Sequence, residues 1–279
     1  MVDILKKLIT TIFCLLLATN VYATSLRDFN DPFIEIPAGN ITGKSSVNKF
    51  GRSSNVDNGV DTDIWDRANA TDDDPTWNAP TAATVATIVS DDVDDDGSPV
   101  GNGARTVKIV GLDANFDEQE ETVTMDGTSG VNTTNTFRRV FRMIVLTSGA
   151  STPNEGTITC TVQGQVTAQI QPGMGQTLMA VYTVPNNATG FMTGYYAALN
   201  KSGAGASVRA DIILLASPPS ASWVEKHRVA VQEDGTSYFQ HSFKPYVKFE
   251  EKTDLRILGN GSANNLDVTA GFDIIIVDD

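Results

Sequence analysis

The sequence predicts an all-β protein: an antiparallel β-sandwich, jelly-roll-like, with an extended N-terminal arm. Short runs in which apolar and polar residues alternate recur from residue 81 to the end of the chain. Turn residues separate most of these runs at intervals of roughly 8–12 residues, which is typical of sandwiches and barrels. No segment after residue 30 has the apolar spacing of a helix of ordinary length.

Residues 1–23 resemble a secretory signal peptide. Lys6 and Lys7 precede an apolar run over residues 8–18, and residues 21–23 (VYA) resemble a small-residue cleavage site. This pattern predicts cleavage after Ala23 and a secreted mature protein without a membrane segment. The apolar run is too short and too often interrupted by Thr to predict a membrane span. The alternative is an anchor helix that docks the chain on a partner protein.

Residues 24–80 predict an extended arm or linker, because Asn, Asp, Ser and Gly are frequent there and apolar runs are few. Isolated aromatic residues interrupt this polar segment, and Phe50, Trp65 and Trp77 are candidate interface residues. Such residues pack either across the surface of a neighbouring subunit or against the chain's own β domain. The sequence gives the two interpretations equal weight.

Residues 81–217 predict the main β-sandwich domain. In its clearest part, strand-like runs at 106–112, 121–125 and 137–145 are separated by segments rich in Gly, Asp and Asn, which predicts an antiparallel meander. A later run places Ile158, Cys160 and Val162 on one face and threonines on the other, as expected for a half-solvated sheet.

Residues 218–279 begin with Pro218 and Pro219, which mark a boundary in the sequence. Further strand-like runs follow, and the last of them, over residues 271–277, is apolar enough for a fully buried strand. We expect this segment to supply the returning strands of the same sandwich. The alternative is a small second β domain.

The acidic composition argues against nucleic-acid binding. The chain has 34 Asp and Glu against 20 Lys and Arg, a formal net charge of −14, whereas nucleic-acid-binding proteins carry a basic surface. The cysteines, Cys14 and Cys160, do not suggest a disulfide framework. Cys160 is expected to be a small buried residue of a strand.

Asp92, Asp94 and Asp96 have the spacing of the first three ligands of a calcium loop, and Gly97 follows them. The twelfth position of such a loop would be Gly103, which cannot supply the bidentate carboxylate, and no helices are expected on either side. A solvated acidic turn is the competing interpretation. No other cofactor is indicated.

The residues that could carry catalysis do not form a recognisable set. The acidic cluster over residues 117–121 lies between two strand-like runs and reads as an exposed hairpin turn. His227 and His241 are the only histidines, and both are expected on the surface, with His241 facing away from Phe239 and Phe243. The sequence therefore predicts a protein that is not an enzyme.

Arg138, Arg139 and Arg142 form a basic cluster within the acidic chain and are further candidate interface residues. They could contact acidic loops of a neighbouring subunit. The alternative is a solvated strand face paired with Asp and Glu side chains of the same chain.

Several phrases of the sequence are distinctive: residues 49–52 (KFGR), 63–66 (DIWD), 101–112 (GNGARTVKIVGL), 120–127 (EETVTMDG), 133–143 (TTNTFRRVFRM) and 177–185 (TLMAVYTVP). In their order along the chain they resemble structural proteins of tailed phages, particularly those of marine phages. The resemblance covers residues 47–279 and is strongest over 49–190.

This resemblance implies a β-rich virion subunit: a head decoration, a head fibre or a tail accessory protein that forms homo-oligomers and binds other virion proteins. It implies no catalytic residues. A virion protein assembled in the cytoplasm needs no secretory signal, so residues 1–23 depart from this expectation. The alternative function is a secreted glycan-binding β-sandwich, in which Trp223, Tyr195, Tyr196 and Tyr238 could stack on sugars; a host surface glycan is accordingly a further candidate partner.

Overall fold

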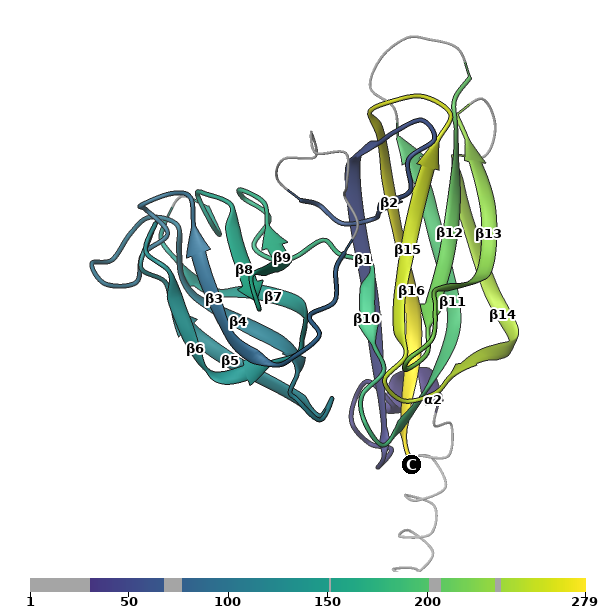
Figure 1. The fold of residues 1–279 in the computed structure, drawn as a ribbon, viewed down its shortest axis with the longest axis horizontal. Helices are drawn as coiled ribbons and strands as arrows, with labels where there is room; N and C mark the ends of the chain where they lie inside the picture. Colours follow the sequence, from purple (N-terminus) through teal and green to yellow (C-terminus); the bar gives the residue numbers. More distant parts are fainter. Residues whose placement is uncertain (1–30, 68–76, 151, 201–206, 234–236) are drawn as a thin grey trace, which may run out of the picture. The chain divides into compact units, whose positions relative to one another are not determined.

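The computed structural model describes residues 31–67, 77–150, 152–200, 207–233 and 237–279, which form strands and one short helix, α2 (Pro32–Glu35) (Figure 1). The chain divides into two units, Met1–Ser45 and Ser46–Asp279. The signal-like segment, residues 1–23, lies outside the described residues. None of the described helices is long and apolar enough to span a membrane.

Helix α2 is a single capped turn in the first unit. The side chain of Asp31 accepts a hydrogen bond of 2.9 Å from the backbone N–H of Phe33, and Pro32 occupies the start of the helix, where its missing N–H costs nothing. Phe33 and Ile34 are exposed within this unit. Local capping therefore explains a helical turn in a segment whose composition predicts an arm.

The larger part of the second unit is a jelly roll of two sheets. One sheet has the order β1–β16–β11–β14, and the other has the order β10–β15–β12–β13, with the short β2 also paired with β15. The strands pair in nested order along the chain: β1 with β16, β2 and β10 with β15, β11 with β14, and β12 with β13. This nested pairing is that of a jelly roll. These strands are β1 (Lys44–Val56), β2 (Thr62–Asp63), β10 (Val181–Thr183), β11 (Ala188–Asn200), β12 (Arg209–Ser217), β13 (Val224–Gln232), β14 (Tyr238–Phe249), β15 (Asp254–Gly261) and β16 (Leu266–Asp278).

A second β-sandwich is inserted into the jelly roll between β2 and β10. Its sheets have the orders β6–β3–β8–β9 and β5–β4–β7, and all described pairings within them are antiparallel. Its strands are β3 (Thr84–Ser90), β4 (Ala104–Leu112), β5 (Glu118–Thr124), β6 (Val131–Phe137), β7 (Arg139–Ser148), β8 (Ile158–Val162) and β9 (Gln165–Ile170). We call it the inserted domain; together the two sandwiches confirm the predicted all-β, jelly-roll-like fold class.

The insertion differs from the domain boundaries that the sequence suggests. Residues 24–80, predicted as an arm, contain β1 and β2, which belong to the two sheets of the jelly roll. The predicted domain over residues 81–217 combines the inserted domain with strands β10 to β12 of the jelly roll. Residues 218–279 do supply returning strands of a sandwich, because β15 and β16 pair with strands from earlier in the chain. Strand pairing over long sequence distances, which no local pattern encodes, produces these differences.

The chain leaves and rejoins the jelly roll at one place. Strands β2 and β10 lie one after the other along β15, since β2 pairs with Leu258 and Gly259 of β15 and β10 pairs with residues 254–256. The two connecting segments also bind each other: the N–H of Ala180 donates to Ile64 O at 2.9 Å, and the N–H of Asp66 donates to the carbonyl of residue 178 at 2.8 Å. We call these two hydrogen-bonded segments the stem.

Each sandwich has a hydrophobic core. The jelly-roll core takes buried side chains from both of its sheets, among them the fully buried Tyr182, Tyr195 and Phe272. The core of the inserted domain includes the predicted inward faces of β4 and β8. Leu112 and Phe141 of the inserted domain nevertheless belong to the jelly-roll core, so apolar packing joins the two sandwiches.

Candidate functional site

Four of the predicted interface residues lie where the inserted domain meets the jelly roll, and we call this region the junction. Trp65 and Trp77 are buried members of the inserted-domain core. Arg138 lies between β6 and β7, and Arg139 is the first residue of β7. Their partners are residues of the same chain.

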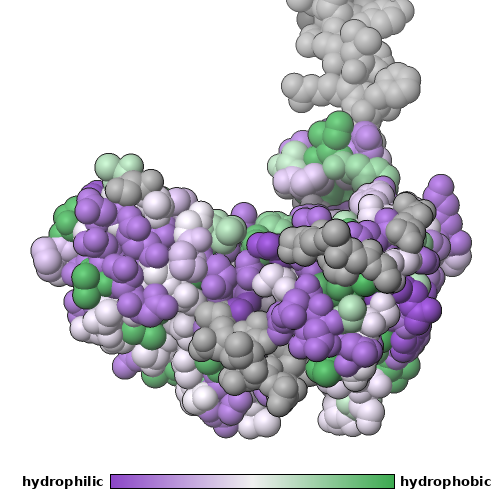
Figure 2. All heavy atoms as spheres, turned by 90° about the horizontal axis from the view of Figure 1, so that it is seen from above, coloured by the Kyte–Doolittle hydropathy of each residue, from purple (hydrophilic) through white to green (hydrophobic). Residues whose placement is uncertain are grey.

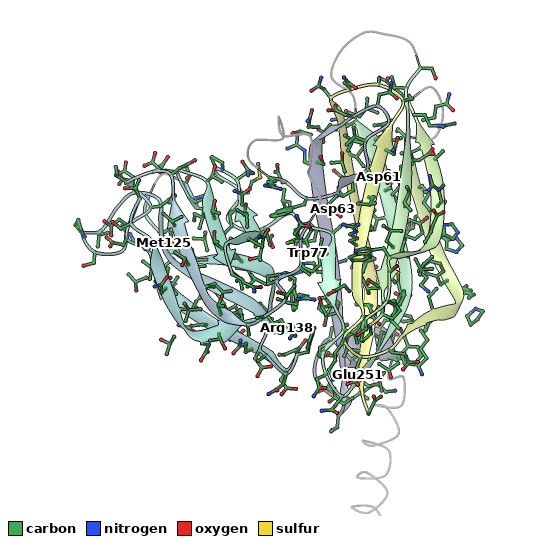
Figure 3. All side chains as sticks on the ribbon, viewed as in Figure 1. Asp61, Asp63, Trp77, Met125, Arg138 and Glu251 are labelled. Carbon is green, nitrogen blue, oxygen red and sulfur yellow. The ribbon has the colours of Figure 1, made fainter. Side chains whose placement is uncertain are left out.

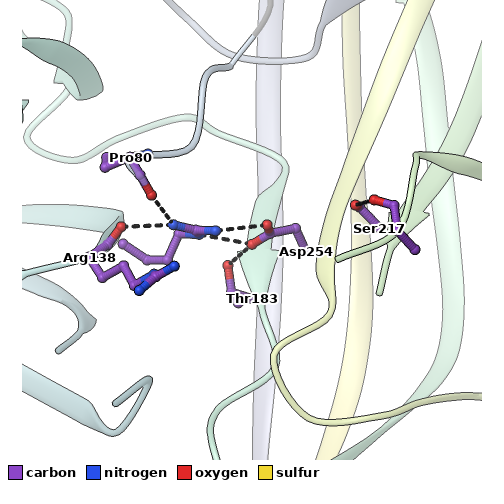
Figure 4. A network of polar contacts seen from close by, with 7 residues as sticks. Pro80, Arg138, Thr183, Ser217 and Asp254 are labelled. Carbon is purple, nitrogen blue, oxygen red and sulfur yellow. Dashed lines mark hydrogen bonds and ion pairs between the residues drawn. The ribbon is translucent and has the colours of Figure 1, made fainter. Parts of the chain in front are cut away.

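Arg139 is held by a buried network of polar contacts at the junction (Figure 4). Its Nε and Nη2 donate to the two carboxylate oxygens of Asp254, each at 3.0 Å. Its Nη1 donates to the carbonyls of Pro80 at 2.8 Å and Arg138 at 3.0 Å. The hydroxyl of Thr183 donates to Asp254 Oδ1 at 2.6 Å. A two-pronged arginine–carboxylate pair fixes both distance and angle between β7 and β15.

Aromatic rings cover the arginines of the junction. The guanidinium of Arg139 lies 5.6 Å from the ring centroid of Trp77 and 5.3 Å from that of Phe116, and Arg138 lies 4.7 Å from the Phe116 ring. Such contacts stabilise a cation that has left bulk water. Phe116 takes a positive φ of 69° in the β4–β5 turn, a conformation that favours glycine, so packing against the arginines has to offset some backbone strain.

A second ion pair extends the junction. Arg256 Nη1 lies 3.3 Å from Asp63 Oδ2, and both side chains are largely buried. The backbone N–H of Trp77 donates to the same oxygen of Asp63, and Figure 3 places Asp63 close to Trp77. The guanidinium of Arg256 also lies 4.1 Å from the ring centroid of Trp223. Asp63 therefore connects β2, β15 and the segment that leads into the inserted domain.

The other two predicted interface residues lie on β1 and β7, two strands that contact each other through Arg142. Phe50 is partly buried on β1, and Arg142 donates from Nη2 to the carbonyl of Asn48 at 2.6 Å. Beside it, the buried amine of Lys49 donates to the carbonyl of Phe141. Burial lowers the pKa of Lys49 well below its ordinary value, and the charge of Arg142 lowers it further. A buried amine bonded to a carbonyl needs no counter-ion when it is neutral.

Asp92, Asp94 and Asp96 do not converge on a common point. The carboxylates of Asp92 and Asp96 accept hydrogen bonds from backbone N–H groups two residues later, which shapes the turn. Among the residues that the structure describes, no group of three or more His, Cys, Asp or Glu side chains could hold a metal ion. The geometry thus gives the calcium hypothesis no support.

Asp95, which the calcium-loop spacing passes over, is the buried carboxylate of this loop that organises the surrounding backbone. It is fully buried, and its Oδ1 accepts from the N–H groups of Ala104 at 2.7 Å and Glu155 at 2.8 Å. Its Oδ2 accepts from the hydroxyl of Ser90 at 2.6 Å and the N–H of Gly156 at 3.0 Å. Four donors to one buried carboxylate replace its hydration, so Asp95 ties the two ends of the β3–β4 loop to the β7–β8 loop of the inserted domain.

The two histidines lie together at the edge of the jelly roll. His227 on β13 and His241 on β14 stack with their ring centroids 4.9 Å apart, and the hydroxyl of Tyr195 is 2.6 Å from His227 Nδ1. The prediction that His241 faces away from Phe239 and Phe243 was wrong: the rings of Phe239 and Phe243 lie 6.2 and 4.7 Å from the His241 ring. Residues two apart on a strand point to the same face, so the three share one side of β14.

Among the aromatic residues proposed for sugar stacking, Tyr196 and Tyr238 lie near each other on the paired strands β11 and β14: Tyr196 pairs with Gln240, burial raises the pKa of Tyr196, and the charges of Asp273 and Tyr238 raise it further. Tyr195 is buried in the jelly-roll core, and the ring of Trp223 is covered by Arg256. Tyr238 is exposed on β14, and its hydroxyl donates to Gln240 at 3.0 Å. Aromatic platforms that bind sugars need exposed ring faces. Of these residues, Tyr238 is the most clearly exposed.

Comparisons with known proteins give little further information. No family model matches the chain, and no curated protein matches it. One solved structure that is similar to part of it is the crystal structure of the infectious bursal disease virus VP2 subviral particle, with 8% sequence identity and a TM-score of 0.21 over 87% of this chain and 74% of that one. A TM-score this low carries no argument about fold or function.

Proposed function

We propose that this chain is a non-enzymatic structural protein of a tailed-phage virion: a head decoration, head fibre or tail accessory subunit. The observation that carries the proposal is the architecture, a jelly roll with a second β-sandwich inserted between β2 and β10. Jelly rolls are common in viral capsid and lectin domains. This is an analogy at the level of the fold, and the sequence phrases that resemble phage structural proteins favour the virion over the lectin.

The use of the charged residues supports a role that depends on shape and contact. Arg139, Asp254 and Asp95 are buried, and each is engaged with partners in the same chain. Side chains that act as acids, bases or nucleophiles must instead be presented to a substrate. The Arg139–Asp254 pair holds the two sandwiches in a fixed arrangement, and Asp95 fixes loops within the inserted domain.

The proposed partners are copies of the same chain and other virion proteins. Exposed hydrophobic side chains available for such contacts lie on the inserted domain at Val93, Val100 and Leu146 and on the jelly roll at Tyr238 and Tyr246. On the face shown in Figure 2, hydrophobic residues form small separate patches among hydrophilic ones. Interfaces in which apolar contacts are mixed with polar ones are common in protein assemblies.

Mass spectrometry of virions tests the proposal directly. Particles of a phage whose genome encodes this chain would be purified through a density gradient and digested with trypsin. We expect its peptides at a copy number comparable to that of other structural proteins, and we expect immunogold labelling on the particle. Absence of the chain from purified particles would refute the proposal. The most N-terminal peptide recovered also reports whether cleavage follows Ala23.

The alternative, a secreted glycan-binding protein, has weaker support because two of the four candidate aromatic residues are not open to a ligand: Tyr195 is buried, and Arg256 covers the ring of Trp223. A glycan array probed with the full chain distinguishes the two functions. Binding that Tyr238→Ala abolishes, together with secretion of a processed chain, would favour the alternative over the virion role. Tyr246→Ala, which removes a second exposed tyrosine from the same strand, is the matched control.

A further inference from the structure

A cluster of aromatic and histidine rings lies between the edge strands β13 and β14, and neither the virion role nor the junction explains it. We call the boundary between these two strands the seam. Strand β13 is an edge strand of one sheet of the jelly roll, and β14 is an edge strand of the other. Most residues of both strands are exposed or only partly buried. The rings of His227, His241, Phe239 and Phe243 meet between these edges and pack on Tyr195 of β11.

The packing of this cluster suits neutral histidine rings. The ring planes of His227 and His241 are inclined by only 26°, so their in-plane nitrogen lone pairs do not converge on a shared metal ion. Phe243 stands edge-on to His241, with the ring centroids 4.7 Å apart. Phe239 lies nearly parallel to His241 at 6.2 Å. Two neutral imidazoles can stack like other aromatic rings, whereas two imidazolium rings at the same separation repel each other.

The surrounding groups provide little compensation for that repulsion. Burial lowers the pKa of His227, the charge of His241 lowers it further, and Glu225 raises it by less than these effects. The Glu225 carboxylate is already bonded to Arg228 at 3.0 and 2.8 Å, and Arg228 also contacts Asp211 on β12. From β11, the group facing His227 is the neutral hydroxyl of Tyr195, which can reverse its hydrogen bond but cannot balance a charge.

We propose that His227 and His241 form a pH-sensitive latch, which closes the β13–β14 seam at neutral pH and loosens it in mildly acidic solution. The direction follows from proton linkage. A histidine whose pKa is lower in the folded chain binds protons more weakly there than in the open state. The latch is therefore fully closed above the ordinary histidine pKa of about 6.5, and it weakens as the pH falls from there toward the lowered pKa of His227.

Hydrogen exchange of the full chain at pH 5.5 and pH 7.5, corrected for the intrinsic pH dependence, tests the latch without reference to any virion. Two unit charges about 4.9 Å apart repel enough, even in bulk water, to raise the local opening constant about fourfold. We expect peptides from β13 and β14 to exchange faster at pH 5.5, with this repulsion contributing up to about fourfold. Peptides from β4 and β7 should show no such change.

Two variants assign the effect to the histidines. His241→Phe keeps an aromatic ring in place but removes the second histidine, and it should reduce the pH difference at the seam to the part that the burial of His227 causes. Lys226→Met removes a neighbouring charge but keeps both histidines, and it should preserve the difference.

Equal exchange of β13 and β14 at the two pH values in the wild-type chain overturns the proposal. A pH difference that is undiminished in His241→Phe also overturns it. Acceleration confined to the neighbourhood of Asp66 or Glu118, whose carboxyl pKa values burial raises, does so as well. If His241→Phe does not fold, the wild-type comparison alone decides.

Discussion

Removal of one partner from the Arg139–Asp254 pair should destabilise the chain strongly. Arg139→Met keeps an unbranched side chain but removes the guanidinium. The two side chains are only 8% and 12% exposed, and breaking a buried ion pair from one side costs about 3–5 kcal/mol. Asp254 would retain the hydroxyl of Thr183 as a donor, and the carbonyl of Pro80 would lose its bond to Arg139. We therefore expect a loss in this range.

Urea unfolding measures this loss. All three tryptophans of the chain, Trp65, Trp77 and Trp223, contribute to the core or ion pairs at the junction, so tryptophan fluorescence reports on this region while circular dichroism reports on all strands. With a denaturant slope of about 3 kcal/mol per molar urea, the midpoint should fall by roughly 1 M or more.

Two comparisons make this test specific. Arg228→Met breaks an equally two-pronged pair, but Arg228 and Glu225 are 47% and 43% exposed, so the loss should stay below about 1 kcal/mol. The double variant Arg139→Met/Asp254→Leu should lose less stability than the sum of the losses of its two single variants, because it leaves no unpaired charge at the junction. A loss below about 1 kcal/mol for Arg139→Met, or strict additivity in the cycle, would refute the reasoning.

Three further variants test other parts of the fold. Asp95→Asn should cost at least about 2 kcal/mol in chemical denaturation, because it weakens four hydrogen bonds to a buried carboxylate, whereas Asp92→Asn should change little; similar losses in the two would contradict the role of Asp95. Gly51→Ala places a Cβ 2.0 Å from a backbone carbonyl oxygen, so the thermal midpoint or soluble yield should drop sharply, while Ser54→Ala on the exposed side of the same strand should be neutral. Lys49→Met should gain stability relative to wild type as the pH falls below about 10.5, because the lowered pKa of Lys49 makes the folded wild-type chain bind its proton less tightly than the unfolded chain; a pH-independent difference would count against this explanation.

The strands of the inserted domain could be predicted from the sequence because their signal is local. Val107 and Ile109 alternate with polar neighbours, and both are fully buried. Ile158, Cys160 and Val162 follow the same rule, and all three lie in the core of the inserted domain. A period of two residues is a property of the strand itself, so it can be read without knowing the partner strand.

The role of β1 could not be read in the same way. Its sequence is mostly polar, and the buried positions before its last residue, Val56, are Lys49, Gly51 and Ser53. The strand is placed by contacts far along the chain, such as the pair of Arg52 with Asp267, 215 residues away. Without an apolar pattern, residues 44–56 resemble a linker, and the insertion of a whole domain after β2 could not be foreseen.

The candidate site shows the same limit. The tryptophans and arginines of the junction stood out in the sequence as unusual residues in their surroundings, but Asp254, the partner of Arg139, lies 115 residues further on. Asp95, rather than a neighbouring aspartate, is the buried carboxylate because the N–H groups of residues 104, 155 and 156 donate to it. These donors cannot be identified from the sequence around Asp95. The orientation of His241 is different: strand parity alone places it beside Phe239 and Phe243, so that prediction failed although the information was local.

The stem bears on whether the inserted domain can be removed or replaced. Because the segments at Ile64 and Ala180 are hydrogen-bonded to each other, both ends of the inserted domain lie at one point of the jelly roll. A domain whose ends are close together can be exchanged for another without altering its host. A short turn joining Ile64 to Ala180 should leave a minimal jelly roll, provided that the surface vacated by Leu112 and Phe141 is made polar. The stem is thus a site at which other β domains could be inserted and displayed on the jelly roll.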